Sequence, residues 1–155
     1  MPRTEGAFPR VSLPGIDAPA TPLADTWSHG PALMLIGHSD CKTTREALPF
    51  VDRIHRRRTQ GSVTAILQDD GASARRLADS LGLELPIRLE ADPYPLAAAL
   101  EVTIVPTLFA LTPKGEIVGV SEGFSRADLE AFAERLGVEG PLFGPEDTVA
   151  ALRPG

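Results

Sequence analysis

Two continuous apolar runs, residues 32–37 (ALMLIG) and 62–67 (SVTAIL), stand out in the first half of the chain. Apolar runs of this length between turn residues predict strands that are buried on both faces of a sheet. Between them, residues 41–58 place apolar side chains on one helical face: Ala47, Leu48, Phe50, Val51 and Ile54. The pattern therefore predicts a strand–helix–strand unit with parallel strands.

The alternation of strands and helices continues after this unit. The amphipathic spacing over residues 71–81 predicts a helix, and Gly82 is a typical helix stop. Residues 86–89 predict a short strand, and residues 95–101 predict a short helix. We therefore expect a third strand to join the parallel pair.

A hairpin and a capped helix follow. Residues 107–111 and 116–120 predict antiparallel strands, because Pro113-Lys114-Gly115 between them is a typical turn. Ser125 predicts the N-cap of a helix over residues 126–136. Parallel and antiparallel pairing together predict an α/β fold, a three-layer sandwich with helices on both faces of a mixed central sheet.

The two ends of the chain carry weaker patterns. Residues 1–30 are rich in proline, glycine and alanine, and they predict an edge strand over 9–13, then a turn, and then a helical turn or short strand over 23–27. We expect one domain over residues 1–137, lead-in included. Residues 138–155 form a Pro/Gly-rich tail that is expected to lie over the surface or fray. The tail would dock on another protein or pack on its own domain through Leu142, Phe143 and Leu152.

Composition narrows the classes of function. The chain has 155 residues and a net charge of −6, which disfavours nucleic acid as a partner because phosphate binding needs a basic face. No apolar stretch is long enough to cross a membrane, and the first six residues carry no apolar run, so we expect a cytoplasmic location without a membrane partner. A single cysteine excludes an internal disulfide.

Three features in a fixed order resemble the thioredoxin superfamily. The first apolar strand is followed by His38-Ser39-Asp40 and then by Cys41 at a helix start. Pro49 lies eight residues after that cysteine, inside the predicted helix, where it is expected to introduce a kink. Val105-Pro106-Thr107 leads into the hairpin. The resemblance covers about residues 8–137, and the short helix before Val-Pro-Thr is most similar to the TlpA/redoxin (AhpC/TSA-like) branch.

The resemblance implies a thioredoxin-like fold and a redox role for Cys41 as the nucleophile. It also implies that Pro106 follows a cis peptide bond and packs against the active-site cysteine. Beside it, Val105 would expose backbone groups that bind a substrate peptide as an added strand. The implied partners are proteins or low-molecular-weight thiols and disulfides, with no cofactor.

The chain departs from the family pattern at several positions. The family's Cys-x-x-Cys reads Cys41-Lys42-Thr43-Thr44, so the resolving cysteine is a threonine. The tryptophan usual before the first cysteine is Asp40. The glutamate common six residues after it in TlpA-like proteins is Ala47, with Glu46 one step earlier. His38 replaces the threonine that peroxiredoxins carry three residues before their cysteine.

Elementary chemistry assigns these neighbours opposing effects on the thiol. A helix N-terminus favours a Cys41 thiolate, because unpaired N–H groups and the positive end of the dipole face it. Lys42 adds a positive charge, and Thr44 is placed to donate its hydroxyl to the sulfur. Asp40 opposes ionisation as a like charge. His38 would act as a base, donor or substrate contact if the loop folds back.

Two functions remain open at this point. One is a monothiol oxidoreductase that works through Cys41 and needs an external thiol to release its product. The other is a non-catalytic binding module that holds a protein at Val105-Pro106. Gly123 after the hairpin predicts a close backbone approach near the site. No metal is expected, because the strand-end carboxylates lack ligand spacing and a histidine partner: Asp69, Asp70, Glu90 and Asp92.

Overall fold

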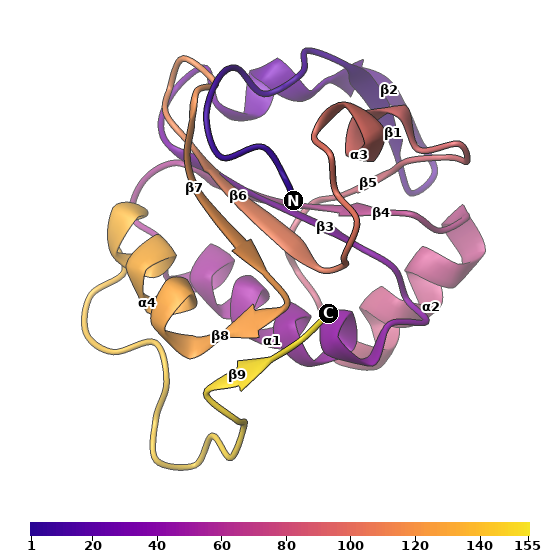
Figure 1. Cartoon of the computed structure of the whole chain (residues 1–155). Helices are drawn as coiled ribbons and strands as arrows, with labels where there is room; N and C mark the ends of the chain where they lie inside the picture. Colours follow the sequence, from indigo (N-terminus) through magenta and orange to yellow (C-terminus); the bar gives the residue numbers. More distant parts are fainter.

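A mixed sheet forms the middle layer of the molecule (Figure 1). The computed structural model describes all 155 residues. The strands of the main sheet are β1 (Ser12–Gly15), β2 (Ala18–Pro22), β3 (Ala32–Gly37), β4 (Ser62–Leu67), β5 (Ile87–Leu89), β6 (Thr107–Leu111) and β7 (Ile117–Glu122). They lie in the order β2-β1-β5-β4-β3-β6-β7. The helices are the 3-10 turn η1 (Leu23–Thr26), α1 (Lys42–Arg57), α2 (Gly71–Leu81), α3 (Pro95–Ala99) and α4 (Arg126–Arg135).

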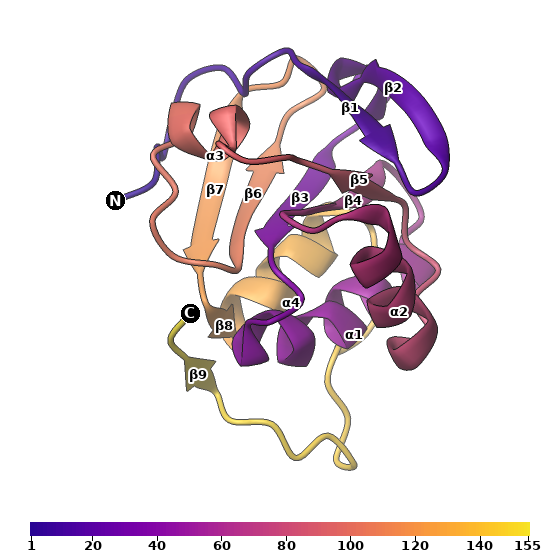
Figure 2. The same ribbon diagram turned by 90° about the vertical axis from the view of Figure 1, so that its right-hand side faces the viewer.

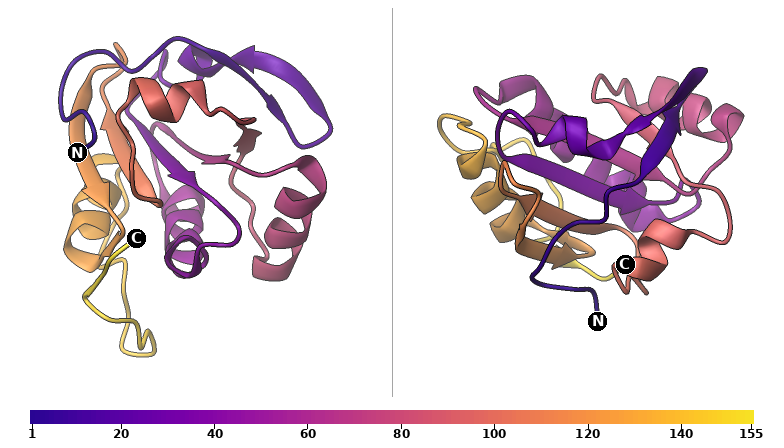
Figure 3. Two further views of the ribbon diagram at one scale, coloured as in Figure 1. Left: turned by 45° about the vertical axis from the view of Figure 1, so that its right-hand side comes forward. Right: turned by 90° about the horizontal axis from the view of Figure 1, so that it is seen from above.

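Strand β3 lies at the centre of the sheet because both of its faces are apolar. It pairs in parallel with β4 and antiparallel with β6, and all six of its residues are buried. Leu33 and Leu35 join the core under α1, α2 and α4, whereas Met34 and Ile36 join the core under η1 and α3. Figures 2 and 3 show these two sets of helices on opposite sides of the sheet. The predicted three-layer α/β class is confirmed.

Several local predictions are confirmed closely. Helix α2 begins and ends at the predicted residues, and Gly82 after it has a left-handed backbone with φ of 63°. The Ser125 hydroxyl caps α4 by accepting from the amide of Asp128 at 3.2 Å. Pro49 lies inside α1 as predicted. Residues 23–26 take the helical alternative.

The prediction of an edge strand over residues 9–13 followed by a turn is wrong in its details. The edge strand is β1 and lies a few residues later than predicted, so Pro14 and Gly15 are strand residues and not a turn. Strand β1 pairs antiparallel with β2, which the pattern did not predict. All five residues of β2 are exposed, so no alternation of apolar positions marks it as a strand.

Residues 138–155 are expected to lie over the surface or to fray, and the structure packs their first half against the domain. Leu142 and Phe143 are buried in the main core, so this part of the tail packs on its own domain, whereas Leu152 is exposed. The Phe143 ring lies 4.7 Å from that of Phe50, between centroids. A separate two-stranded sheet pairs β8 (Phe124–Ser125) with β9 (Leu152–Arg153). The core therefore continues past the boundary predicted at residue 137.

Candidate thiol site

Cys41 occupies the N-cap position of α1, where the chain leaves β3 and enters the helix. Its backbone is extended, with φ of −84° and ψ of 119°, and its amide donates to the His38 carbonyl at 3.0 Å. The thiol is free and partly buried, and it donates to the carbonyl oxygen of Val105 at 3.3 Å. Helix α1 thus presents its unpaired first-turn N–H groups beside the only sulfur nucleophile of the chain.

The charged neighbours of Cys41 lie toward solvent. The Lys42 side chain is exposed, and the Asp40 side chain is 94% exposed. Solvent screens charges in such positions, so neither acts on the thiol as strongly as it would from a buried position. The helix N-terminus is fixed by the fold and is therefore the steadier influence on the sulfur.

Thr44 lies three residues after Cys41, where the resemblance implies a second cysteine, but its hydroxyl makes no hydrogen bond to the Cys41 sulfur. The residue is fully buried, and its hydroxyl oxygen instead accepts a long hydrogen bond, 3.5 Å, from the His38 amide. Its methyl group packs against the backbone of Gly37, where an added Cβ would lie 2.7 Å from it. The prediction of a hydrogen bond from the Thr44 hydroxyl to the sulfur is therefore wrong. Thr44 contacts the backbone of Gly37 and His38 instead.

Asp69 fixes the loop that carries Cys41, a role that sequence reasoning missed. Its carboxylate is 2% exposed and accepts hydrogen bonds from the amide of Ser39, at 3.0 Å, and from the Ser39 hydroxyl. Asp69 follows β4, the parallel neighbour of β3, so the two strand ends meet at one edge of the sheet. That shared edge is the signal that could have revealed the contact.

The His38 ring also makes contacts that hold the loop in place. Its Nδ1 accepts from the amide of Asp40 at 3.0 Å, and its Nε2 lies 3.9 Å from the Asp69 carboxylate. Arg45 adds a 2.5 Å hydrogen bond to the carbonyl of Ser39. The ring makes no hydrogen bond to the thiol, so the geometry favours a loop-forming role for His38 over that of a base.

Val105 and Pro106 form a ledge opposite the helix start. The Val105–Pro106 peptide bond is cis, and Pro106 is buried while Val105 is partly exposed. The carbonyl of Pro106 accepts from the Gly123 amide at 2.7 Å. A cavity of about 340 Å³ opens beside Val105 and is lined in part by Tyr94 and Val102. The ledge thus combines a backbone edge with an adjoining recess of mixed polar and apolar lining.

The end of the tail reaches the same place. The Pro154 carbonyl accepts from the Thr43 hydroxyl at 2.7 Å, and the Arg153 guanidinium lies 2.7 Å from the Glu46 carboxylate. Figures 1 and 3 show the C-terminal residue beside the start of α1. Gly123, with φ of 74°, allows the approach predicted for it, since an added Cβ would lie 2.3 Å from the Arg153 carbonyl oxygen.

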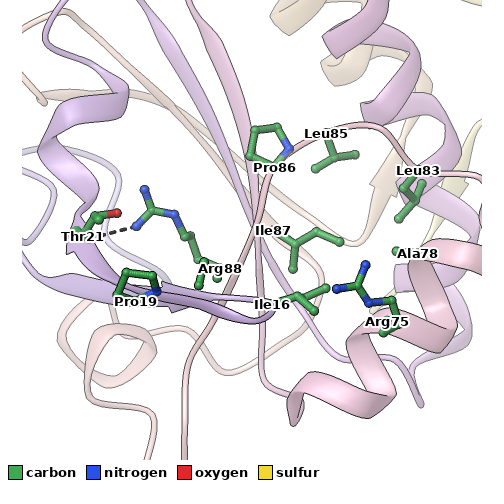
Figure 4. A pocket seen from close by; sticks show the side chains of 12 residues that line it. Ile16, Pro19, Thr21, Arg75, Ala78, Leu83, Leu85, Pro86, Ile87 and Arg88 are labelled. Carbon is green, nitrogen blue, oxygen red and sulfur yellow. Dashed lines mark hydrogen bonds between the residues drawn. The ribbon is translucent and has the colours of Figure 1, made fainter.

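Other features of the molecule lie apart from the thiol. A cavity of about 470 Å³ between the β1–β2 hairpin, β5 and α2 is lined by apolar side chains and by Arg75 and Arg88, as Figure 4 shows. Arg88 is anchored there by a 2.9 Å hydrogen bond to the Thr21 carbonyl. The chain holds no group of three histidine, cysteine or acidic residues arranged to bind a metal, and no helix fits a membrane span.

Comparison with solved structures places this geometry among known folds. A Chlorobium tepidum protein with the provisional name thiol:disulfide interchange protein DsbE has a TM-score of 0.75 and 20% identity, over 87% of this chain and 96% of that one. The thioredoxin domain of a Bacteroides vulgatus thiol-disulfide oxidoreductase has a TM-score of 0.75 and 14% identity, over 85% and 96%. DsbF of Mycobacterium tuberculosis has a TM-score of 0.71 and 16% identity, over 82% and 95%.

These similarities establish a thioredoxin-like fold for the chain. No protein-family model and no curated protein matches it.

Proposed function

We propose that this protein is a monothiol redox protein that carries out thiol–disulfide exchange through Cys41 with an external resolving thiol. The observation that carries the proposal is the placement of the only cysteine. Its sulfur lies at the N-terminus of α1, 3.3 Å from the carbonyl of Val105, in a fold shared with thiol-disulfide oxidoreductases. Thr44 fills the second thiol position, so the chain has no resolving sulfur of its own.

The exchange has two balanced steps. In the first, the Cys41 thiolate attacks one sulfur of a partner disulfide, forms a mixed disulfide and expels the partner's other sulfur as a thiolate. In the second, an external thiolate attacks the partner's sulfur in the mixed disulfide. Cys41 leaves as the thiolate, and the external group stays on the partner. The number of disulfide bonds is unchanged, because the partner's own disulfide has been exchanged for a mixed disulfide with the external thiol, and a second external thiol reduces that bond.

The residues around Cys41 have two roles in this exchange. The first turn of α1 presents its unpaired N–H groups beside the sulfur that attacks and later leaves. The ledge of Val105 and Pro106 holds a partner segment by its backbone, because an extended chain pairs with exposed N–H and C=O groups. Proteins and small thiols of the cytoplasm are the partners we propose.

The test is mixed-disulfide formation with oxidised glutathione, followed by intact mass. The native chain should gain one glutathionyl group faster than the same chain unfolded in urea, which shows the reactivity of Cys41 without the fold. Cys41→Ser should gain none. A folded chain that reacts more slowly than the unfolded one, also when Arg153→Glu breaks the ion pair between Arg153 and Glu46, would overturn the proposal, because the fold itself would then be protecting the thiol.

A second candidate function is non-covalent binding of a protein partner. The tail segment that lies beside Val105 favours it, since this surface already holds an extended chain without a covalent bond. A partner captured equally by the native chain and by Cys41→Ser would support binding alone. Loss of that partner in Cys41→Ser would favour the redox function.

A further inference from the structure

An extended segment of the chain itself lies beside the Cys41–Val105 contact. We call residues 152–155 the strap. Strand β9 within it pairs antiparallel with β8, with Arg153 opposite Phe124, and the Ala151 carbonyl accepts from the Arg126 amide at 3.0 Å. The strap therefore lies in the manner of a bound peptide, as an added strand.

Two side chains of the first turns of α1 hold the strap. Glu46, whose side chain is 16% exposed, pairs with Arg153 at 2.7 Å, and the Thr43 hydroxyl donates to the Pro154 carbonyl at 2.7 Å. Glu46 thus binds the basic side chain of Arg153, and Thr43 binds the backbone of the residue after it. No other basic residue pairs with Glu46.

The last residue of the strap reaches the ledge. A Cβ on Gly155 would lie 2.4 Å from the carbonyl oxygen of Val105 and 2.2 Å from the side chain of Ile104. The same Val105 oxygen accepts the thiol of Cys41. A partner segment that approaches Cys41 along this ledge meets the strap first.

We propose that the strap is an internal ligand of the surface, formed by Thr43, Glu46 and Val105, over which a protein partner reaches Cys41. A partner displaces the strap with an extended segment of its own, and Glu46 and Thr43 select segments that carry a basic residue at the place of Arg153. The inference rests on the proposed function only in taking Cys41 as the reactive group. The strap suits such displacement because it buries little apolar surface and Leu152 is 72% exposed.

A charge swap in the full chain tests the strap. Arg153→Glu and Glu46→Arg each turn the ion pair into a repulsion, and the double variant restores it with opposite signs. The readout is the limiting alkylation rate of Cys41 by iodoacetamide at high pH, where changes in thiol ionisation no longer contribute. Each single variant should react about fivefold faster, as expected for loss of a surface ion pair. The double variant should return to the native rate.

Arg57→Glu is the matched control, because Arg57 is exposed near the far end of α1 and forms no ion pair. It should leave the rate unchanged. Single swaps that react at the native rate, or a double variant that stays as fast as the singles, would overturn the proposal.

A peptide with the sequence of residues 151–155, labelled with a fluorophore, tests the selectivity. It should bind the Arg153→Glu chain up to about fivefold more tightly than the native chain, whose own strap competes. The same peptide with glutamate in place of arginine should bind the Glu46→Arg chain instead. Equal binding of both peptides to both variants would overturn the selectivity. Binding that persists in Cys41→Ser separates this inference from the exchange chemistry, which needs the sulfur.

Discussion

Replacing Asp69 by alanine should loosen the loop that carries Cys41 while leaving the sheet intact. The carboxylate joins the end of β4 to Ser39 in the loop after β3, through the Ser39 amide and hydroxyl. Alanine removes both acceptors. It also leaves a partly buried amide without a partner, which is the costly outcome for a hydrogen-bonded pair.

The structure sets the size of the effect. Hydrogen bonds to a charged group contribute roughly 1.5–3 kcal/mol each. Asp69 accepts two such bonds. Only 2% of its side chain is exposed, so the free energy cost of desolvating the carboxylate offsets part of their contribution. Taking the low end for each gives a loss of about 3 kcal/mol in the free energy of unfolding. That is a large share of the roughly 5–15 kcal/mol that holds a typical domain together.

Urea unfolding followed by the fluorescence of Trp27, the single tryptophan, measures the loss. Hydrogen exchange at the Ser39 amide measures the loosening, and exchange there should rise toward the rate of an unprotected amide. Asp70→Ala is the matched control. Its neighbouring carboxylate caps α2 through the Ser73 amide and should cost less, with Ser39 exchange unchanged. Equal exchange at Ser39 in the native chain and in Asp69→Ala would refute the reasoning.

Three further outcomes follow from the structure. Thr44→Cys should close a disulfide with Cys41 under mild oxidation, seen as the loss of both free thiols, because the residues share one helix turn; two persistent thiols would contradict this. The Arg53 guanidinium lowers the pKa of Asp147 to about 2, so its contribution to stability is present above the unfolded pKa of about 4 and is lost as the pH falls toward 2. Melting temperatures between pH 5 and 2 should therefore fall less steeply in Asp147→Asn; equal slopes would contradict the pairing. Desolvation, and then Arg58, lower the pKa of His55 below 6.5, so stability should fall as the pH drops below 6.5, and His55→Gln should reduce that slope.

The parts of the fold that local patterns encode could be predicted from the sequence. Strands β3 and β4 match residues 32–37 and 62–67, because an apolar run buried on both faces needs no partner to be recognised. The end of α2 followed from Gly82, and the start of α4 from Ser125, since caps act within one turn. Strand β2 has only exposed residues and owes its place to its pairing with β1.

The candidate site divides in the same way. The strand, the loop and the helix start around Cys41 are local features, but its contact with Val105, 64 residues away, was implied only by the resemblance. The predicted hydrogen-bond partner of the Thr44 hydroxyl was wrong, because the choice between the sulfur and the His38 amide depends on how the loop folds. Asp69 lies 30 residues from Ser39, and no local pattern joins them.

The two halves of the tail, residues 138–147 and residues 152–155, are held by different kinds of contact. Its first half is anchored by Phe143, which packs in the core, and by Arg53, which donates hydrogen bonds to both carboxylate oxygens of Asp147 at 2.8 and 3.2 Å. Its last residues rest on one ion pair and a few hydrogen bonds. Surface contacts of this kind open at a small cost in free energy, whereas core packing opens only with the domain. A partner can therefore lift the strap away from Cys41 while residues 138–147 stay packed and the domain remains folded.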